Sequence, residues 1–185
     1  TFTNNDRNMH LNEDGLNMQI AACADGAAAA LNTGIGMDAS FFIREAAPVP
    51  LVQGTQHAII HVPADYAVGF QITPSDNILS VWGNIVHLTA TGENCCNYGD
   101  RVPGIWFHPG TRRLHIRDGH GTDGNAGCDP EEQLSANVPT TVRVEMRPGF
   151  VEVWFGEPGS DELRCTAARG DRQTFDNVVV YAADP

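Results

Sequence analysis

Residues 140–155 read TTVRVEMRPGFVEVWF, and this stretch decides the fold class. In it Val142, Val144 and Met146 alternate with polar or charged residues, and after Pro148-Gly149 the alternation resumes through residues 151–155. A period of two residues points one set of side chains into a core and the other toward water, and Pro-Gly is typical of a tight turn. The stretch therefore predicts an antiparallel hairpin with one buried face.

The same alternation continues through the chain from about residue 58, where Val68, Phe70 and Ile72 alternate with small or polar neighbours. Nine strands are predicted, at residues 58–62, 67–73, 78–90, 102–108, 113–117, 139–147, 150–155, 162–168 and 174–181. No convincing helical period follows residue 58. Many short strands with Gly- and Pro-containing turns predict an all-β fold, an antiparallel β-sandwich of the jelly-roll type.

The first 55 residues differ from the rest of the chain. Residues 1–18 are rich in Asn and Asp, an alanine-rich stretch follows, and residues 46–50 resemble a linker. We predict two parts: an N-terminal arm over residues 1–55, packed on the sandwich or on a neighbour, and a sandwich domain over residues 56–185.

Composition excludes several classes of partner. Among 185 residues, 23 are acidic and 11 are basic, which gives a net charge of −12, and every basic residue is arginine. A chain of this sign repels phosphate backbones, so we expect no nucleic-acid partner. No apolar run approaches the roughly 18 residues of a membrane helix, so no membrane span is expected. The chain starts without Met or a signal-like segment, which favours a mature secreted form or a fragment.

Five cysteines occur, at Cys23, Cys95, Cys96, Cys128 and Cys165, and none lies in a C-x-x-C motif. Because adjacent cysteines do not easily bond to each other, we expect Cys95 and Cys96 each to bond a different cysteine, with Cys128 and Cys165 as the natural partners. Cys23 would then be unpaired or form an intermolecular link. This pattern favours a secreted, extracellular protein over a cytosolic one with five reduced thiols.

A longer pattern runs through residues 94–130. It comprises NCCNYGDR at 94–101, PGIWF at 103–107, PGT at 109–111, RLHIR at 113–117 and GNAGCDP at 124–130. In these motifs the chain resembles laminin-G-like modules of the concanavalin A-like lectin and glucanase superfamily, over about residues 58–181. The resemblance implies a concanavalin A-like jelly roll, a scaffold that hosts lectins, adhesion modules, enzymes and structural proteins.

The loop over residues 118–129 is rich in Asp, Gly and Asn. Calcium prefers six to eight oxygen ligands on flexible backbone, and many laminin-G-like modules bind calcium at a loop rim, so the resemblance supports an ion here. The predicted metal ligands are Asp118, Asp123, Asn125 and Asp129. The loop lacks EF-hand spacing, and the alternative is a set of Asx turns without an ion.

Sugars are bound by aromatic faces that stand beside fixed planar polar groups. The predicted ligand-binding residues of this kind are Trp82, Asn84, Tyr98, Asp100, Arg101, Trp106, His108, Arg117 and Trp154. The alternative for each Trp is a place in or near the core. His108 and His115 flank the turn at residues 109–111; we expect a structural cross-strand pair there, and the alternative is a soft-metal site.

A glycan-cleaving enzyme on this fold needs a pair of carboxylates, and the Glu-x-Asp-x-x-Glu pattern of the glucanase branch is missing. Glu145 and Glu152 lie outward on neighbouring strands beside arginines, so we expect a salt-bridged cross-strand pair. No catalytic residue is therefore predicted. In the tripeptide Arg169-Gly170-Asp171, both charged residues are expected to be loop-stabilising ion partners rather than an integrin ligand.

These observations favour a non-catalytic extracellular binding or adhesion module that recognises a glycan or a protein partner, with calcium as a possible cofactor. The alternative is a structural subunit of an extracellular filament, sheath or wall that self-assembles through the arm and Cys23. A glycan-cleaving enzyme on the same fold is the third and weakest hypothesis.

Overall fold

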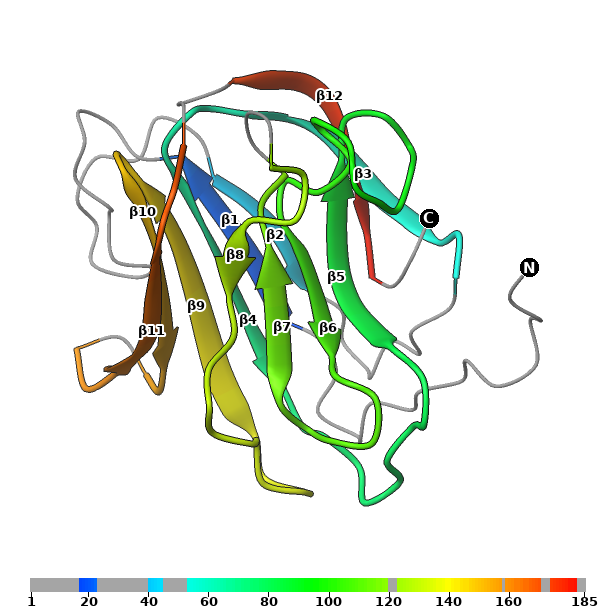
Figure 1. Ribbon diagram of the computed structural model, residues 1–185, viewed down its shortest axis with the longest axis vertical. Helices are drawn as coiled ribbons and strands as arrows, with labels where there is room; N and C mark the ends of the chain where they lie inside the picture. Colours follow the sequence, from blue (N-terminus) through cyan, green and yellow to red (C-terminus); the bar gives the residue numbers. More distant parts are fainter. Residues whose placement is uncertain are drawn as a thin grey trace.

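The computed structural model describes residues 17–22, 40–44, 53–119, 123–157, 159–170 and 174–182. Within these residues every regular element is a β-strand, and the strands form two six-stranded antiparallel sheets (Figure 1). The all-β prediction and the antiparallel β-sandwich are confirmed, and the jelly-roll topology stays a prediction. Nothing in the described part of the chain is a helix with the length and apolar character needed to cross a membrane.

The first sheet contains the hairpin that the alternation predicts. Its order is β11 (Glu162–Ala168), β10 (Phe150–Phe155), β9 (Thr140–Arg147), β4 (Tyr66–Ile72), β1 (Asn17–Ala22) and β2 (Ser40–Arg44). In the β9–β10 hairpin Val144 lies opposite Val153, and Glu145 lies opposite Glu152. β1 pairs with β4, so part of the N-terminal segment extends this sheet.

The second sheet carries most of the candidate binding residues. Its order is β3 (Gln56–Val62), β12 (Phe175–Tyr181), β5 (Gly83–Thr89), β6 (Gly104–Phe107), β7 (Leu114–Arg117) and β8 (Gly127–Cys128). The predicted strand at residues 78–90 is shorter in the structure, since β5 begins at Gly83. The residues before it stay outside the sheet, and Ile78 and Trp82 are exposed there.

One hydrophobic core lies between the sheets, and the alternation defines it on both sides. Val142, Val144 and Met146 of β9 are fully buried, as are Leu114 and Ile116 of β7. The intervening residues of β7, which the alternation places on the opposite face, are only partly buried. Burial of such aliphatic side chains is the main stabilising term for a sandwich of this size.

The disulfides differ from the expected pairing. Cys128 is bonded to Cys165, and Cys95 is bonded to its neighbour Cys96. β8 is an edge strand of the second sheet and β11 an edge strand of the first, and the Cα atoms of Cys128 and Cys165 lie 6.1 Å apart. That distance is within the range a disulfide spans, so the pairing follows from how the two edges meet. Cys23 lies outside the described residues.

Arg169 is buried in a network that connects the two sheets. It follows β11 of the first sheet, and its Nε donates to Asp118 Oδ2, at the end of β7 in the second sheet, over 2.7 Å. Its Nη1 donates to the carbonyl oxygen of Ala64 over 2.6 Å and lies 3.8 Å from Asp65 Oδ1. The role of Arg169 as an ion partner is confirmed, whereas Asp171 lies outside the described residues.

Candidate functional site

Strands β5 to β8 bring polar and aromatic residues into one row on the outer face, by which we mean the side of this sheet opposite the core. Asn84 of β5 lies opposite Trp106 of β6, and Trp106 lies opposite His115 of β7. Ile116 pairs with Cys128, which brings the next residue, Asp129, beside His115. Four chain segments therefore contribute to one surface.

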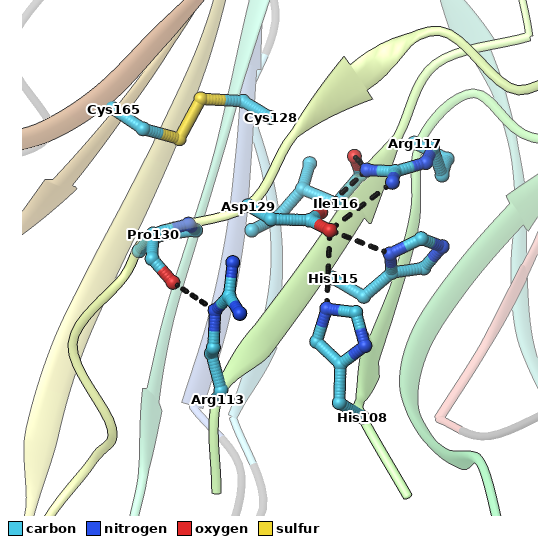
Figure 2. The surroundings of a disulfide bond; sticks show 9 residues. All are labelled: His108, Arg113, His115, Ile116, Arg117, Cys128, Asp129, Pro130 and Cys165. Atoms are coloured by element: carbon cyan, nitrogen blue, oxygen red, sulfur yellow. Dashed lines mark hydrogen bonds and ion pairs between the residues drawn. A yellow bond between two sulfur atoms is a disulfide. The ribbon is translucent and has the colours of Figure 1, made fainter.

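Asp129 is the centre of this surface (Figure 2). Its Oδ1 accepts a hydrogen bond of 2.5 Å from Arg117 Nη1, and its Oδ2 accepts one of 3.1 Å from Arg117 Nη2. His108 Nε2 and His115 Nδ1 each lie 3.1 Å from the same Oδ2. Because an ionised carboxylate only accepts hydrogen bonds, both of these imidazole nitrogens carry a hydrogen in this arrangement.

The surroundings of Asp129 keep it ionised. Burial alone would raise the pKa of this carboxyl, but the hydrogen bonds from His115 and Arg117 outweigh burial and hold the pKa well below its usual value. Burial lowers the pKa of His115, and the nearby Arg117 charge lowers it further, against the opposing effect of Asp129. Near neutral pH the arrangement therefore combines a carboxylate, a guanidinium and a neutral His115.

Trp82 packs against both imidazoles and remains open to solvent. Its ring centroid lies 4.9 Å from that of His108 and 4.5 Å from that of His115. Trp82 remains 45% exposed, although a large aromatic side chain normally gains by burial. An exposed indole backed by rigid polar rings is a surface on which an apolar ligand face can stack.

Trp106 is almost fully buried, so its ring packs beneath the outer face and is not accessible to a ligand. The guanidinium of Arg101 lies 4.6 Å above its ring, and His87 meets its edge with a centroid separation of 5.3 Å. A Cβ on Gly104 would lie 2.0 Å from Trp106 Cη2, so the indole lies directly over the glycine. Only a residue without a side chain leaves room for the indole at this position.

Asn84 has a side-chain amide that is buried without compensation. The residue is 7% exposed, and neither Oδ1 nor Nδ2 has a hydrogen-bond partner among the described residues. An unpaired buried polar group costs about 1–3 kcal/mol. A buried amide of this kind ordinarily finds a partner in an ordered water, an ion or a ligand.

The four predicted calcium ligands do not converge in the structure. Asp118 is buried against Arg169, and Asp129 is held by Arg117 and the two histidines. Asn125 Oδ1 accepts a hydrogen bond from Arg101, and Asp123 Oδ1 accepts one from the backbone of residue 125. Each of the four residues thus has a hydrogen-bond partner of its own in the protein, and calcium binding stays a prediction.

Three of the predicted ligand-binding residues lie away from the outer face. Trp154 is on β10 of the first sheet, where the Arg143 guanidinium lies 4.9 Å from its ring. Tyr98 is 45% exposed and packs on Phe175 at a centroid distance of 5.1 Å. Asp100 is buried in the loop and accepts hydrogen bonds from the backbone and side chain of Asn97.

Two outer-face residues were missing from the predicted ligand set. His115 was considered only as the partner of His108, although its place between Leu114 and Ile116 predicts an outward side chain. His87 is three residues after Asn84, a spacing that in a regular strand puts the two on opposite faces, but a bulge between Asn84 and Val86 brings His87 to the outer face. A bulge leaves no trace in the alternation.

The two carboxylates that a glycan-cleaving enzyme would need, Glu145 and Glu152, form ion pairs with arginines. Glu145 is almost fully buried and forms ion pairs with Arg143 and Arg147. Arg147 Nε also lies 3.2 Å from Glu152 Oε2, so one guanidinium bridges the cross-strand pair. The expected salt-bridged arrangement is confirmed for these residues, and within it Glu145 is almost fully buried although the alternation places it on the face opposite the core-facing valines.

A scan against protein-family models and searches of curated proteins and of solved structures find no match to this chain.

Proposed function

We propose that the chain is an extracellular, laminin-G-like binding module whose outer face recognises a glycan through Trp82. The observation that carries the proposal is the exposure of the Trp82 ring directly against His108 and His115. Sugars present flat C–H surfaces that pack on aromatic rings and hydroxyl groups that need polar partners. Trp82 supplies the ring, and the adjoining His–Asp–Arg arrangement supplies polar groups whose positions are fixed.

Rigidity supports a binding role for this face. His115 is fixed by Asp129, and Asp129 is fixed by Arg117 and follows the disulfide-bonded Cys128 (Figure 2). Polar groups that are already ordered lose little conformational freedom when a ligand binds. The fixed side chains of this face therefore support a role in binding a ligand without rearrangement of the surface.

Charge points to the class of glycan. Residues 101–117 contain four arginines and two histidines but no acidic residue, although the whole chain has a net charge of −12. Arg112 and Arg113 donate to the backbone oxygens of Leu134 and Pro130, and neither forms an ion pair within the described residues. Two guanidinium groups without an ion-pair partner in the described part of the chain favour a glycan with carboxylate or sulfate groups.

The disulfides support an extracellular location. Two disulfides are formed by Cys95–Cys96 and Cys128–Cys165. Such bonds persist in oxidising compartments and are rare in the cytosol. A secreted module that binds extracellular glycans is the proposal consistent with both features.

The test is a glycan array that contains neutral, uronate-bearing and sulfated oligosaccharides, followed by titration of any hit. We expect binding to an acidic oligosaccharide, weakened by salt, and a loss of about tenfold in affinity in Trp82→Ala from the lost aromatic contact. Trp154→Ala, which alters an aromatic residue on the other sheet, is the matched control and should bind normally.

Two results would overturn the proposal. One is the absence of any bound glycan across the array. The other is a hit whose affinity is unchanged in Trp82→Ala; sensitivity to Trp154→Ala instead would place the binding surface on the first sheet.

A further inference from the structure

Three side chains of types that commonly bind metal ions in proteins meet at the outer face. His108 follows β6, His115 lies on β7 and Asp129 follows β8, so the three come from separate segments (Figure 2). One ligand atom from each, the two imidazole nitrogens and a carboxylate oxygen, lies within 4.8 Å of the others. We call these residues the His–Asp cluster.

The spacing of the cluster fits a small tetrahedral ion. Two ligand atoms that are each about 2.0–2.1 Å from a tetrahedral zinc lie about 3.3 Å from one another. Asp129 Oδ2 is 3.1 Å from His108 Nε2 and 3.1 Å from His115 Nδ1. A small rotation of the two rings would therefore be enough to place all three atoms around one ion.

The chemistry of the donors selects the kind of ion. Two imidazoles and one carboxylate suit Zn²⁺ and neighbouring transition ions, whereas Ca²⁺ prefers a shell made only of oxygens. Each imidazole can present a lone pair to the ion by moving its hydrogen to the other ring nitrogen, with no change in net charge. Three protein ligands leave a fourth position for water or for a ligand oxygen.

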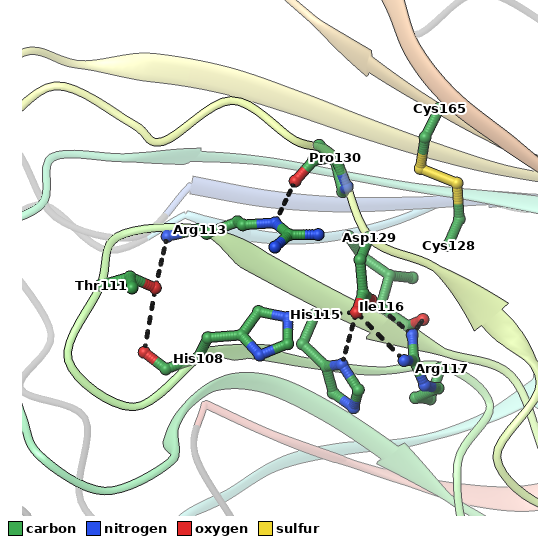
Figure 3. Close-up of polar contacts among 10 residues, drawn as sticks. All are labelled: His108, Thr111, Arg113, His115, Ile116, Arg117, Cys128, Asp129, Pro130 and Cys165. Carbon is green, nitrogen blue, oxygen red and sulfur yellow. Dashed lines mark hydrogen bonds and ion pairs between the residues drawn. A yellow bond between two sulfur atoms is a disulfide. The ribbon is translucent and has the colours of Figure 1, made fainter.

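The neighbouring residues hold the ligands in place. Arg117 binds both oxygens of Asp129, through Nη1 to Oδ1 and Nη2 to Oδ2, and so fixes the orientation of the carboxylate whose Oδ2 also faces the two histidines. Thr111 Oγ1 donates to the carbonyl oxygen of His108 over 3.2 Å and accepts from the Arg113 backbone over 3.2 Å, which ties down the turn (Figure 3). Contacts of this second layer typically account for about 10–100-fold in metal affinity.

Solvent reaches the cluster without any rearrangement of the fold. The side chain of His108 is 25% exposed, that of Asp129 20% and that of His115 12%. We propose that the His–Asp cluster is a binding site for a divalent transition ion of the zinc class. The site stands on its own geometry, so it does not depend on glycan recognition by Trp82.

The experiment uses the intact chain after removal of metal with a chelator and dialysis. Zinc chloride is titrated by calorimetry, and cobalt chloride is followed by its visible absorption, which reports tetrahedral nitrogen and oxygen ligation. We expect saturable binding of a single ion per chain. His108→Gln, His115→Gln and Asp129→Asn should each weaken zinc binding by about tenfold or more.

The matched control is His61→Gln. His61 Nδ1 lies 2.6 Å from Asp176 Oδ1 in an exposed pair that has no third metal-binding group among the described residues, so its loss should leave zinc affinity unchanged. Because a variant of the cluster can also unfold, nitrogen NMR of the unmodified chain is the second measurement: zinc should shift the imidazole signals of His108 and His115. The proposal is overturned if the unmodified chain shows no saturable binding, or if zinc leaves both imidazole signals in place.

Discussion

Arg169 Nε donates a 2.7 Å hydrogen bond to Asp118 Oδ2, and both side chains are almost completely buried. The two residues are 51 positions apart in the chain and directly follow strands of different sheets, Asp118 after β7 and Arg169 after β11. Their interaction therefore depends on the assembled sandwich and contributes to it.

The first prediction concerns this ion pair. Arg169→Met should lower the free energy of unfolding by about 3–5 kcal/mol, because it leaves Asp118 buried without its main charge partner. Denaturant unfolding followed by fluorescence measures the change. Arg164→Met is the control: Arg164 pairs with Glu132 and Glu162 in a more exposed setting, and its loss should cost less than about 1 kcal/mol. Equal losses in the two variants would contradict a special role for Arg169.

The second prediction concerns alkaline pH. Burial raises the pKa of Tyr66, the Asp118 charge raises it further, and Arg169 opposes them only partly. A phenol whose pKa is higher in the folded state stabilises the fold fully below its unfolded pKa of about 10, and this contribution is lost as the pH rises above that value. The free energy of unfolding should therefore decrease from about pH 9 upward, and it should decrease less steeply in the Tyr66→Phe variant.

The control for the alkaline effect is Tyr98→Phe. Tyr98 is half-exposed, so this variant should lose stability with rising pH in the same way as the parent chain. Urea unfolding at a series of pH values compares the three proteins. If Tyr66→Phe and the parent have superimposable pH profiles, ionisation of Tyr66 is not the cause.

The third prediction separates the two disulfides. The Cys128–Cys165 bond closes a loop with a sequence separation of 37, so its replacement by two serines should cost about 4 kcal/mol. The Cys95–Cys96 bond joins neighbours and constrains very little unfolded chain, so its replacement should cost about 1 kcal/mol or less. Thermal and denaturant unfolding of the two double variants measures both losses of stability. A larger loss for the Cys95–Cys96 variant than for the Cys128–Cys165 variant would refute the chain-entropy account.

The fourth prediction concerns Gly104, where a Cβ would lie 2.0 Å from Trp106. Gly104→Ala should displace the indole, change the near-ultraviolet circular dichroism and destabilise the fold by about 1–3 kcal/mol. Gly54→Ala is the comparison, because Gly54 has a positive φ of 78° but nothing within 4 Å of the added atom. It should lose stability through its backbone alone and leave the tryptophan signal unchanged, so a Gly104→Ala variant with an unaltered spectrum would disprove the overlap.

Much of the fold could be predicted from local sequence. The alternation around Val144 and Val153 reflects burial on one side of a pleated strand, and the Pro148-Gly149 turn brings the two strands together, so the hairpin follows from neighbouring residues. The ion pairs that Arg147 forms with Glu145 and Glu152 could be predicted in the same way, because arginines flank Glu145 in the sequence.

The candidate site depends on contacts that local patterns do not carry. Asp129 reaches His115 because β8, only two residues long, pairs with β7, and so short a strand has no period to detect. His87 reaches Trp106 because of a bulge in β5. The pairing of Asp118 with Arg169, like that of Cys128 with Cys165, depends on which strands of the two sheets lie close to one another in the assembled fold.

The bond between Cys128 and Cys165 also has a mechanical consequence. When tension is applied along the chain, the 37-residue span between these cysteines cannot extend, which withholds about 120–130 Å of contour length at about 3.3–3.6 Å per residue. The withheld span contains all of β9 and β10, two central elements of the first sheet. Under an applied force, the chain would therefore extend by only part of its length, and the β9–β10 hairpin would stay within a closed covalent loop.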